Sequence, residues 1–91
     1  MKQETRNAAW AIANGYCRAC GKALGAAGVV HHRKLRSQGG TDDLGNLVVI
    51  HANPCHTAIH ANPLAARDAG LIVSAYADPL DIPIGRLRLP G

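Results

Sequence analysis

Four of the five histidines of the chain stand in two pairs that could take part in metal chemistry. His31 and His32 are adjacent, whereas His56 and His60 are separated by three residues. On a helix, positions four apart lie on one face, one turn apart, so the second pair could hold a single ion. On a strand, adjacent side chains point to opposite faces, so His31 and His32 cannot share one role. One could join the metal while the other stays free as a base.

This set of side chains suits the hydrolysis of a phosphodiester bond. Three neutral imidazoles leave coordination positions open, as catalytic metal sites require. Cleavage needs a base for water, a cation on the phosphate oxygens and help for the leaving oxygen, and one metal with one histidine can supply these. Imidazole ligands favour Zn, Ni, Co or Mn over Mg, although cellular availability could select Mg or Mn. The alternative for the helical pair is that both histidines simply face solvent.

Three cysteines form a second group of candidate ligands. Cys17 and Cys20 have the C-x-x-C spacing, and Cys55 stands directly before His56. Three cysteines cannot form a complete disulfide framework, and the first residues lack the apolar run of a secretory signal. No stretch is long enough to cross a bilayer. We therefore expect a cytoplasmic, reducing location without membrane contact, where cysteines bind metal rather than form disulfides.

The helices and strands that the sequence predicts around these residues form a small single domain of the α+β class, covering residues 1–91. An Ala-rich helix is expected over residues 3–14, followed by a tight turn at "YCRACGK". Strands are expected at "GVVHH" and, buried on both faces, at "NLVVI". The motif core spans residues 16–62 and ends in the helical turns of "PCHTAIH". A short helix at "PLAARDA", a strand at "LIVSAY" and an edge strand near residues 86–89 complete the C-terminal part, residues 63–89.

Composition points to a polyanionic partner and to a poor core. Ten Lys and Arg residues against six Asp and Glu give a formal net charge of +4. Arg33, Lys34 and Arg36 directly follow the histidine pair, so we expect them to contact DNA phosphates, the alternative being a solvated loop face. There is no Phe, and the aromatic residues Trp10 and Tyr76 are expected to anchor the core. A structural metal would offset the small apolar area.

The order His31-His32, Asn46, His56 and His60 resembles the HNH endonuclease family, also called the ββα-metal nucleases. The segments "CRAC", "HHRKLRSQGG", "NLVVI" and "CHTAIHANP" are similar to those of small HNH proteins from actinobacteria and their phages. The likeness covers residues 16–76. It implies a ββα-metal motif with a structural zinc knuckle, and an enzyme that nicks or cuts DNA with little sequence preference, leaving a 5′-phosphate and a 3′-hydroxyl.

The resemblance implies a role for each residue of the histidine constellation. His31, His56 and His60 would hold one catalytic divalent ion, which could be Mg, Mn, Ni, Co or Zn. His32 would be the general base that takes a proton from water. Asn46 would orient this base through the strand and loop that carry it.

The structural zinc of this family is usually held by two C-x-x-C pairs, and this chain departs from that pattern. Ala52 stands where the first cysteine of the second pair is expected. We interpret the site as Cys17, Cys20, His51 and Cys55, with His51 replacing the missing cysteine. The alternative is a decayed zinc site in which Cys55 is only a buried thiol.

The resemblance also implies partners. DNA is the expected substrate, and relatives encoded by phages act beside the genome-packaging terminase, in the host cytoplasm. The competing hypothesis is a non-catalytic zinc-containing module that binds nucleic acid. Such a module would share the cysteines and the basic charge but would have no use for His32.

Overall fold

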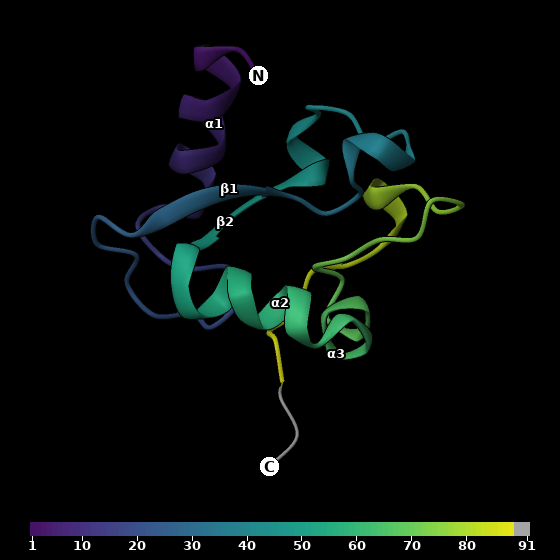
Figure 1. Ribbon diagram of the computed structural model, residues 1–91. Coiled ribbons are helices and arrows are strands. Elements are labelled where there is room, and N and C mark those ends of the chain that lie inside the picture. The colour runs from purple at the N-terminus through teal and green to yellow at the C-terminus, as the bar shows by residue number, and fades with distance from the viewer. Residues whose placement is uncertain (89–91) are drawn as a thin grey trace.

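The protein is built around a two-stranded antiparallel sheet, seen here in a computed structural model that describes residues 1–88. β1 (Gly28–His32) pairs with β2 (Leu47–His51), with Gly28 opposite His51 and His32 opposite Leu47. Figure 1 shows helix α1 on one side of this sheet and helices α2 and α3 on the other. Both strands lie where the sequence predicts them within one residue. The predicted α+β class is confirmed.

Helix α1 (Gln3–Ala13) agrees with the helix predicted over residues 3–14. Its alanines favour the helix, and Asn14 ends it in the left-handed conformation, with φ 52° and its N–H donating to the Trp10 carbonyl. Trp10 is half-buried and packs against the core, as predicted. Its ring lies over Gly28, where an added Cβ would come within 2.4 Å of a ring carbon. Glycine at the start of β1 therefore allows α1 to pack closely on the sheet.

The segment after β2 turns sharply into the helices that carry the second histidine pair. The short turn η3 (Ala52–His56) contains Asn53 in an extended conformation, and helical backbone continues from it into α2 (Thr57–Ala61). Asn62 interrupts the helix, and α3 (Pro63–Asp68) begins with Pro63, whose missing N–H costs nothing at this position. The predicted helical turns and the break between them are confirmed.

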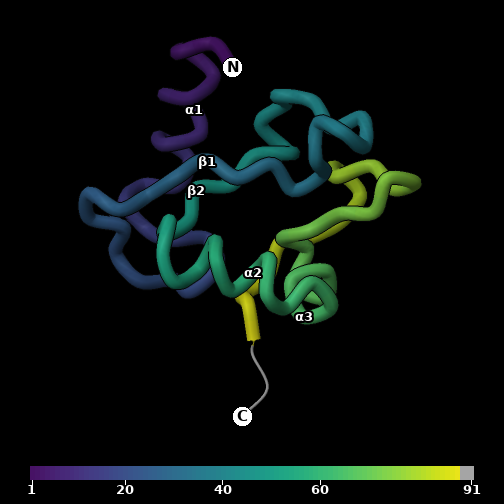
Figure 2. Tube along the Cα trace, in the orientation of Figure 1, coloured from purple at the N-terminus to yellow at the C-terminus, as the bar shows by residue number. Residues whose placement is uncertain are grey.

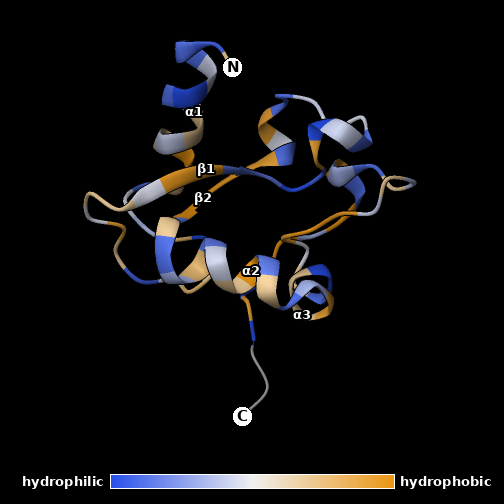
Figure 3. Ribbon diagram, in the orientation of Figure 1, coloured by the Kyte–Doolittle hydropathy of each residue, from blue (hydrophilic) through white to orange (hydrophobic). Residues whose placement is uncertain are grey.

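The buried core joins β2 to residues of α1, α2, α3 and the loops around them, and Figure 3 shows apolar residues on the strands. β2 is buried on both faces, as expected from its run of aliphatic residues. Most of the remaining buried side chains are small, so the core contains little apolar area for its length. Its largest aliphatic members are Leu24, Leu47, Val48, Val49, Ile50, Ile59, Leu71 and Val73.

The predicted strand at residues 71–76 is wrong. The N–H groups of Leu71 and Ile72 both donate to the Ala66 carbonyl, and the N–H of Val73 donates to the Arg33 carbonyl. The segment therefore wraps the end of α3 and cannot form a ladder. Its apolar residues serve the core, because Leu71 and Val73 are buried. Tyr76 is 100% exposed beyond them, so its predicted role as a core anchor is also wrong.

The predicted edge strand near residues 86–89 is not present over residues 86–88, and Leu89 lies outside the described residues. The Leu87 N–H makes one bond to the Ala19 carbonyl, and the Arg86 guanidinium donates to the carbonyls of Cys17 and Arg18. These bonds fasten the C-terminal segment to the turn that carries Cys17. Figure 2 shows the chain beginning at α1 on one side of the sheet and its last described residues leaving on the other.

The packing of α2 on the sheet predicts a strong effect of substituting Ile59. This side chain is 0% exposed, so Ile59→Ala should lower the free energy of unfolding by about 2–5 kcal/mol. The matched control is Leu64→Ala on α3, which removes the same kind of side chain from a position that is 75% exposed, and should change it by less than about 0.5 kcal/mol. Urea denaturation at one fixed zinc concentration measures both. Equal losses in the two variants would contradict this packing.

Candidate metal centres

Three histidines meet between β1 and α2 and form the three-histidine cluster, His31, His56 and His60. Their ligand atoms all lie within 4.8 Å of one another. The Nε2 atoms of His56 and His60 are 3.1 Å apart. Two nitrogen ligands of one tetrahedral ion, each at about 2.0–2.1 Å from the metal, would lie about 3.3 Å apart. The spacing of these imidazoles therefore fits a shared divalent ion.

The elements explain why these three rings converge. His31 is the fourth residue of β1 and faces α2, while His56 and His60 lie one helical turn apart on the side facing the strand. Exposure increases across the cluster, because His31 is buried, His56 is half-buried and His60 is exposed. The cluster is thus open toward solvent beside His60. Three ligands with one open side leave room for a water or a substrate oxygen at a fourth position.

The tautomer of His31 follows from its surroundings. Its Nε2 lies 2.8 Å from the Leu71 carbonyl oxygen. The pKa of His31 is lowered to about 4, mainly by burial and in part by the nearby charges of His56 and His60, against the raising effect of the hydrogen bond to Leu71. The ring is therefore neutral near pH 7, with its proton on Nε2. This leaves the lone pair of Nδ1 free to accept a metal ion.

His32 lies outside the three-histidine cluster and is held by an acidic residue. Its Nε2 is 2.7 Å from Oδ1 of Asp42, and Arg36 donates to both oxygens of the same carboxylate at 2.8 Å. The hydrogen bond with His32 is the main cause that lowers the pKa of Asp42; burial opposes it, and the charge of Arg36 adds to the lowering. An ionised carboxylate only accepts hydrogen bonds, so Nε2 of His32 carries a proton and, in the neutral ring, Nδ1 carries the lone pair.

The contribution of Asp42 was missed in the sequence. Its only signal is the acidic pair Asp42-Asp43 within a loop that is otherwise basic and Gly-rich. Such a pair is common at loop surfaces. Only the fold shows that one member lies against His32, ten residues earlier in the chain.

Asn46 fastens the loop that connects these residues. It is buried, its Oδ1 accepts from the Lys34 N–H at 2.7 Å, and its Nδ2 donates to the carbonyls of Lys34 and Thr41 at 3.0 and 2.8 Å. Lys34 lies two residues after His32, and Thr41 precedes Asp42. One side chain therefore holds both ends of the segment that brings His32 and Asp42 together.

The basic run after the histidine pair divides into buried and exposed members. The prediction that Arg33 contacts a DNA phosphate is wrong, because Arg33 is 2% exposed and its guanidinium donates to backbone carbonyls. Lys34 is half-buried, and its Nζ donates to the Ala77 carbonyl at 3.2 Å. The Arg36 side chain is 60% exposed beside Asp42. Only the last two of the three can present charge toward a ligand.

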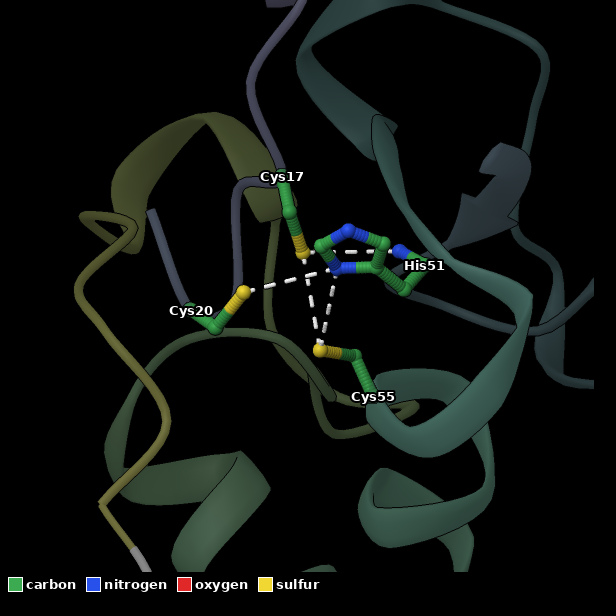
Figure 4. A group of neighbouring side chains, drawn as sticks. All are labelled: Cys17, Cys20, His51 and Cys55. Atoms are coloured by element: carbon green, nitrogen blue, oxygen red, sulfur yellow. Dashed lines mark hydrogen bonds between the residues drawn. The ribbon is translucent and has the colours of Figure 1, made fainter. Parts of the chain in front are cut away.

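The second group, the cysteine cluster, consists of Cys17, Cys20, His51 and Cys55, whose side chains converge in Figure 4. The sulfur atoms of Cys17 and Cys55 are 3.6 Å apart, and Nδ1 of His51 lies 3.4 Å from the Cys20 sulfur and 3.6 Å from that of Cys55. Around a tetrahedral zinc, sulfur atoms lie about 3.8 Å apart, and sulfur lies about 3.6 Å from nitrogen. The four donors, His51 among them, are therefore compatible with a structural zinc.

Hydrogen bonds prepare these donors for a cation. Nε2 of His51 lies 2.8 Å from the Ala23 carbonyl oxygen, which leaves Nδ1 to face the sulfur atoms. The pKa of Cys17 is lowered to about 6, because bonds from backbone N–H groups, such as those of Cys20 and His51, outweigh the raising effect of burial. Burial and the neighbouring thiols raise the pKa of Cys55 to about 12. A thiol with so high a pKa as that of Cys55 loses its proton only beside a cation, so Cys55 would join Cys17 as a thiolate when a metal binds.

Comparison with protein families agrees with this arrangement, since a family model described as HNH endonuclease matches residues 17–62. The chain belongs to the HNH endonuclease family. Comparisons with curated proteins and with solved structures gave no significant match. The HNH match contains every ligand of both clusters, whereas α3 and the segment after it lie beyond it. Among the described residues of this HNH protein, no helix has the length and apolar character needed to span a membrane.

The burial of His31 predicts a pH dependence of stability when the HNH histidine site holds no metal. Its folded pKa of about 4 lies below the ordinary 6.5, so the unfolded chain takes up a proton that the folded chain refuses. The resulting stabilisation is present above pH 6.5 and is lost as the pH falls toward 4. Denaturation without added catalytic metal should therefore show wild type losing stability relative to His31→Gln, whose amide can still donate to Leu71. A constant difference over this range would contradict the assignment of a neutral, buried His31.

Proposed function

We propose that this HNH protein is a metal-dependent DNA endonuclease that hydrolyses phosphodiester bonds and leaves a 5′-phosphate and a 3′-hydroxyl. The observation that carries the proposal is the convergence of His31, His56 and His60 on one point, open to solvent on one side, in a chain of this family. The enzyme nicks or cuts DNA with little sequence preference of its own. A packaging terminase as its partner stays a prediction from the resemblance alone.

The three-histidine cluster would hold one divalent ion, which could be Mg, Mn, Ni, Co or Zn. When bound, such an ion polarises the scissile phosphate and stabilises the leaving oxygen. His31 is kept neutral by burial and is oriented by the Leu71 carbonyl, so its lone pair is available without the loss of a proton. The imidazoles of His56 and His60 approach from the adjacent helical turn.

His32 would be the general base, acting through Nδ1. The carboxylate of Asp42 holds the opposite ring nitrogen at 2.7 Å, which fixes the tautomer and the ring plane. As the attacking water gives its proton to Nδ1, the ring becomes an imidazolium, and the negative charge of Asp42 stabilises it. Asn46 would keep this pair aligned by closing the loop from Lys34 to Thr41.

Lys34 and Arg36 would contact the DNA backbone. The Lys34 ammonium uses one of its three protons on Ala77, which leaves two for a phosphate oxygen. Arg36 is largely exposed and keeps donors beyond the two bonds to Asp42. Both lie within four residues of His32, and the net charge of +4 favours approach of a polyanion.

The cysteine cluster would hold one structural zinc through Cys17, Cys20, His51 and Cys55. It joins the turn before β1, the end of β2 and the start of the helical segment, which are distant in sequence. Zinc binding at such a site contributes directly to folding, and a core with few large side chains needs that contribution.

Substitution of His51 tests the zinc site. His51→Ala should weaken Co²⁺ binding at the cysteine cluster and lower the melting temperature, because it removes one of four ligands, whereas His51→Cys should preserve binding with four thiolates. The thiolate-to-cobalt charge-transfer band reports this cluster alone. His60→Ala is the matched control and should leave the band unchanged. A full band in His51→Ala would remove His51 from the ligand set.

A supercoiled-plasmid nicking assay tests the nuclease. His32→Ala should reduce cleavage by about 10²–10⁴-fold, the usual contribution of a general base, with DNA binding retained in a gel-shift assay. Asp42→Asn should give a smaller loss, because the amide oxygen still accepts from His32 but carries no charge to stabilise the imidazolium. His56→Ala should lose both cleavage and binding of the catalytic ion.

The competing function predicts a different outcome. Wild-type protein that binds DNA but cuts it with none of the five candidate ions would favour the non-catalytic zinc module. Unchanged cleavage by His32→Ala would leave a metal-dependent enzyme but give the role of base to another group. Matched measurements on the wild type and the variants therefore separate the class of protein from the role of His32.

A further inference from the structure

Arg33 is the largest fully buried side chain of the described residues, and its environment is unusual for a charged group. Its guanidinium donates to four backbone carbonyls, which belong to Gly70, Gly45, Pro79 and Ile82. Four carbonyl oxygens replace the water that the charge has lost, and they use four of its five donors. The lengths of the first three bonds are 2.6, 2.8 and 2.9 Å, so the guanidinium is held firmly.

Three of these carbonyls come from the segment beyond the family match, which ends at residue 62. The bond with the clearest consequence joins Arg33 Nε to the Gly70 carbonyl oxygen at 2.6 Å. The next carbonyl, that of Leu71, accepts from Nε2 of His31. The N–H of Val73 then donates to the Arg33 carbonyl at 2.9 Å. The segment from Gly70 to Val73 is therefore fastened at three successive points to the end of β1.

The backbone at Gly70 has little freedom to adopt another conformation. Its φ is +76°, and an added Cβ would lie 2.1 Å from the Pro83 carbonyl oxygen and 3.4 Å from the Arg33 guanidinium. The turn at the end of α3 is thus packed between Arg33 and the C-terminal segment. A shift of the Gly70 carbonyl would move the Leu71 carbonyl with it, since the two are joined by one residue.

We propose that Arg33 is a positioning residue of the three-histidine cluster. By holding the Gly70 carbonyl, it fixes the Leu71 carbonyl against His31 and keeps the His31 proton on Nε2. The lone pair of Nδ1 then faces His56 and His60. The inference rests on the proposed function in that it takes His31 as a metal ligand. Lysine cannot replace Arg33 here, because a single ammonium lacks the planar fork that reaches carbonyls on several segments.

The test uses the full chain loaded with one equivalent of Zn²⁺ and compares wild type with Arg33→Lys and Arg33→Met. Long-range ¹H–¹⁵N spectra report which nitrogen of His31 carries the proton, and a Co²⁺ titration reports the affinity of the three-histidine cluster. Wild type should hold the proton on Nε2. Both variants should show mixed tautomers and bind Co²⁺ about 10–100-fold more weakly, as substitutions behind a metal ligand usually do. Arg67→Lys, at an exposed position of α3, is the matched control and should change neither.

Arg33→Lys protein that keeps the Nε2 proton and wild-type Co²⁺ affinity would overturn the proposal. Two measurements on the wild type can overturn the proposal even if both variants fail to fold. The Arg33 Nε–H should exchange slowly with solvent, and exchange as fast as that of Arg67 would overturn the proposal, as would a His31 proton on Nδ1. None of these readouts needs DNA cleavage. A wild type that passes them but cuts no plasmid counts against the nuclease and not against the role of Arg33.

Discussion

The antiparallel register of β1 and β2 is the constraint on which both clusters depend. It places Gly28 opposite His51 at one end of the ladder and His32 opposite Leu47 at the other. A slip of one residue would turn every side chain of a strand to the opposite face and would break both ligand sets together. The segment after β2 completes the arrangement, because the adjacent residues Cys55 and His56 enter different clusters from a single turn. Neighbouring residues on a helix point about 100° apart, which makes this division possible.

Hydrogen bonds from side chains to the backbone fasten segments of the chain that the small apolar core does not hold in place. The chain has no Phe, and many of its buried apolar residues are Ala or Val. Asn46 closes the loop after β1, Arg33 joins that strand to the C-terminal segment, and Arg86 joins the same segment to the turn around Cys17. Each bond also satisfies a backbone group that would otherwise lose its partner on burial. The loops around both clusters are therefore fixed by specific polar contacts rather than by apolar packing.

Local signals in the sequence predict most of the elements and place His56 and His60 on one helix face, and the family resemblance predicts which residues form the two clusters, whereas contacts between distant segments decide what the sequence leaves out. The spacing of His56 and His60, the apolar run of β2 and the break at Pro63 depend only on neighbouring residues. Residues 71–76 have the composition of a strand, but the end of α3 and Arg33 take up the hydrogen bonds that a ladder would need. The sequence predicts a phosphate contact for Arg33 because the four acceptors that bury it lie 12–49 residues away. Asp42 is hidden for the same reason, since only the folded loop brings it to His32.

In each cluster a backbone carbonyl orients one histidine ring. The two carbonyls differ in whether they belong to the HNH motif or to the segment after it. In His31 and in His51, Nε2 lies 2.8 Å from a backbone carbonyl oxygen, so Nδ1 is the ring nitrogen left for a metal. The carbonyl behind His51 belongs to Ala23, inside the matched HNH region, whereas the one behind His31 belongs to Leu71, outside it. The motif thus supplies every ligand but not every group that orients them. The cysteine cluster has four donors, and all four lie within the motif, as does the carbonyl that orients His51. The three-histidine cluster has only three rings to define its geometry. Its buried ring, His31, therefore depends for its orientation on the segment beyond the motif.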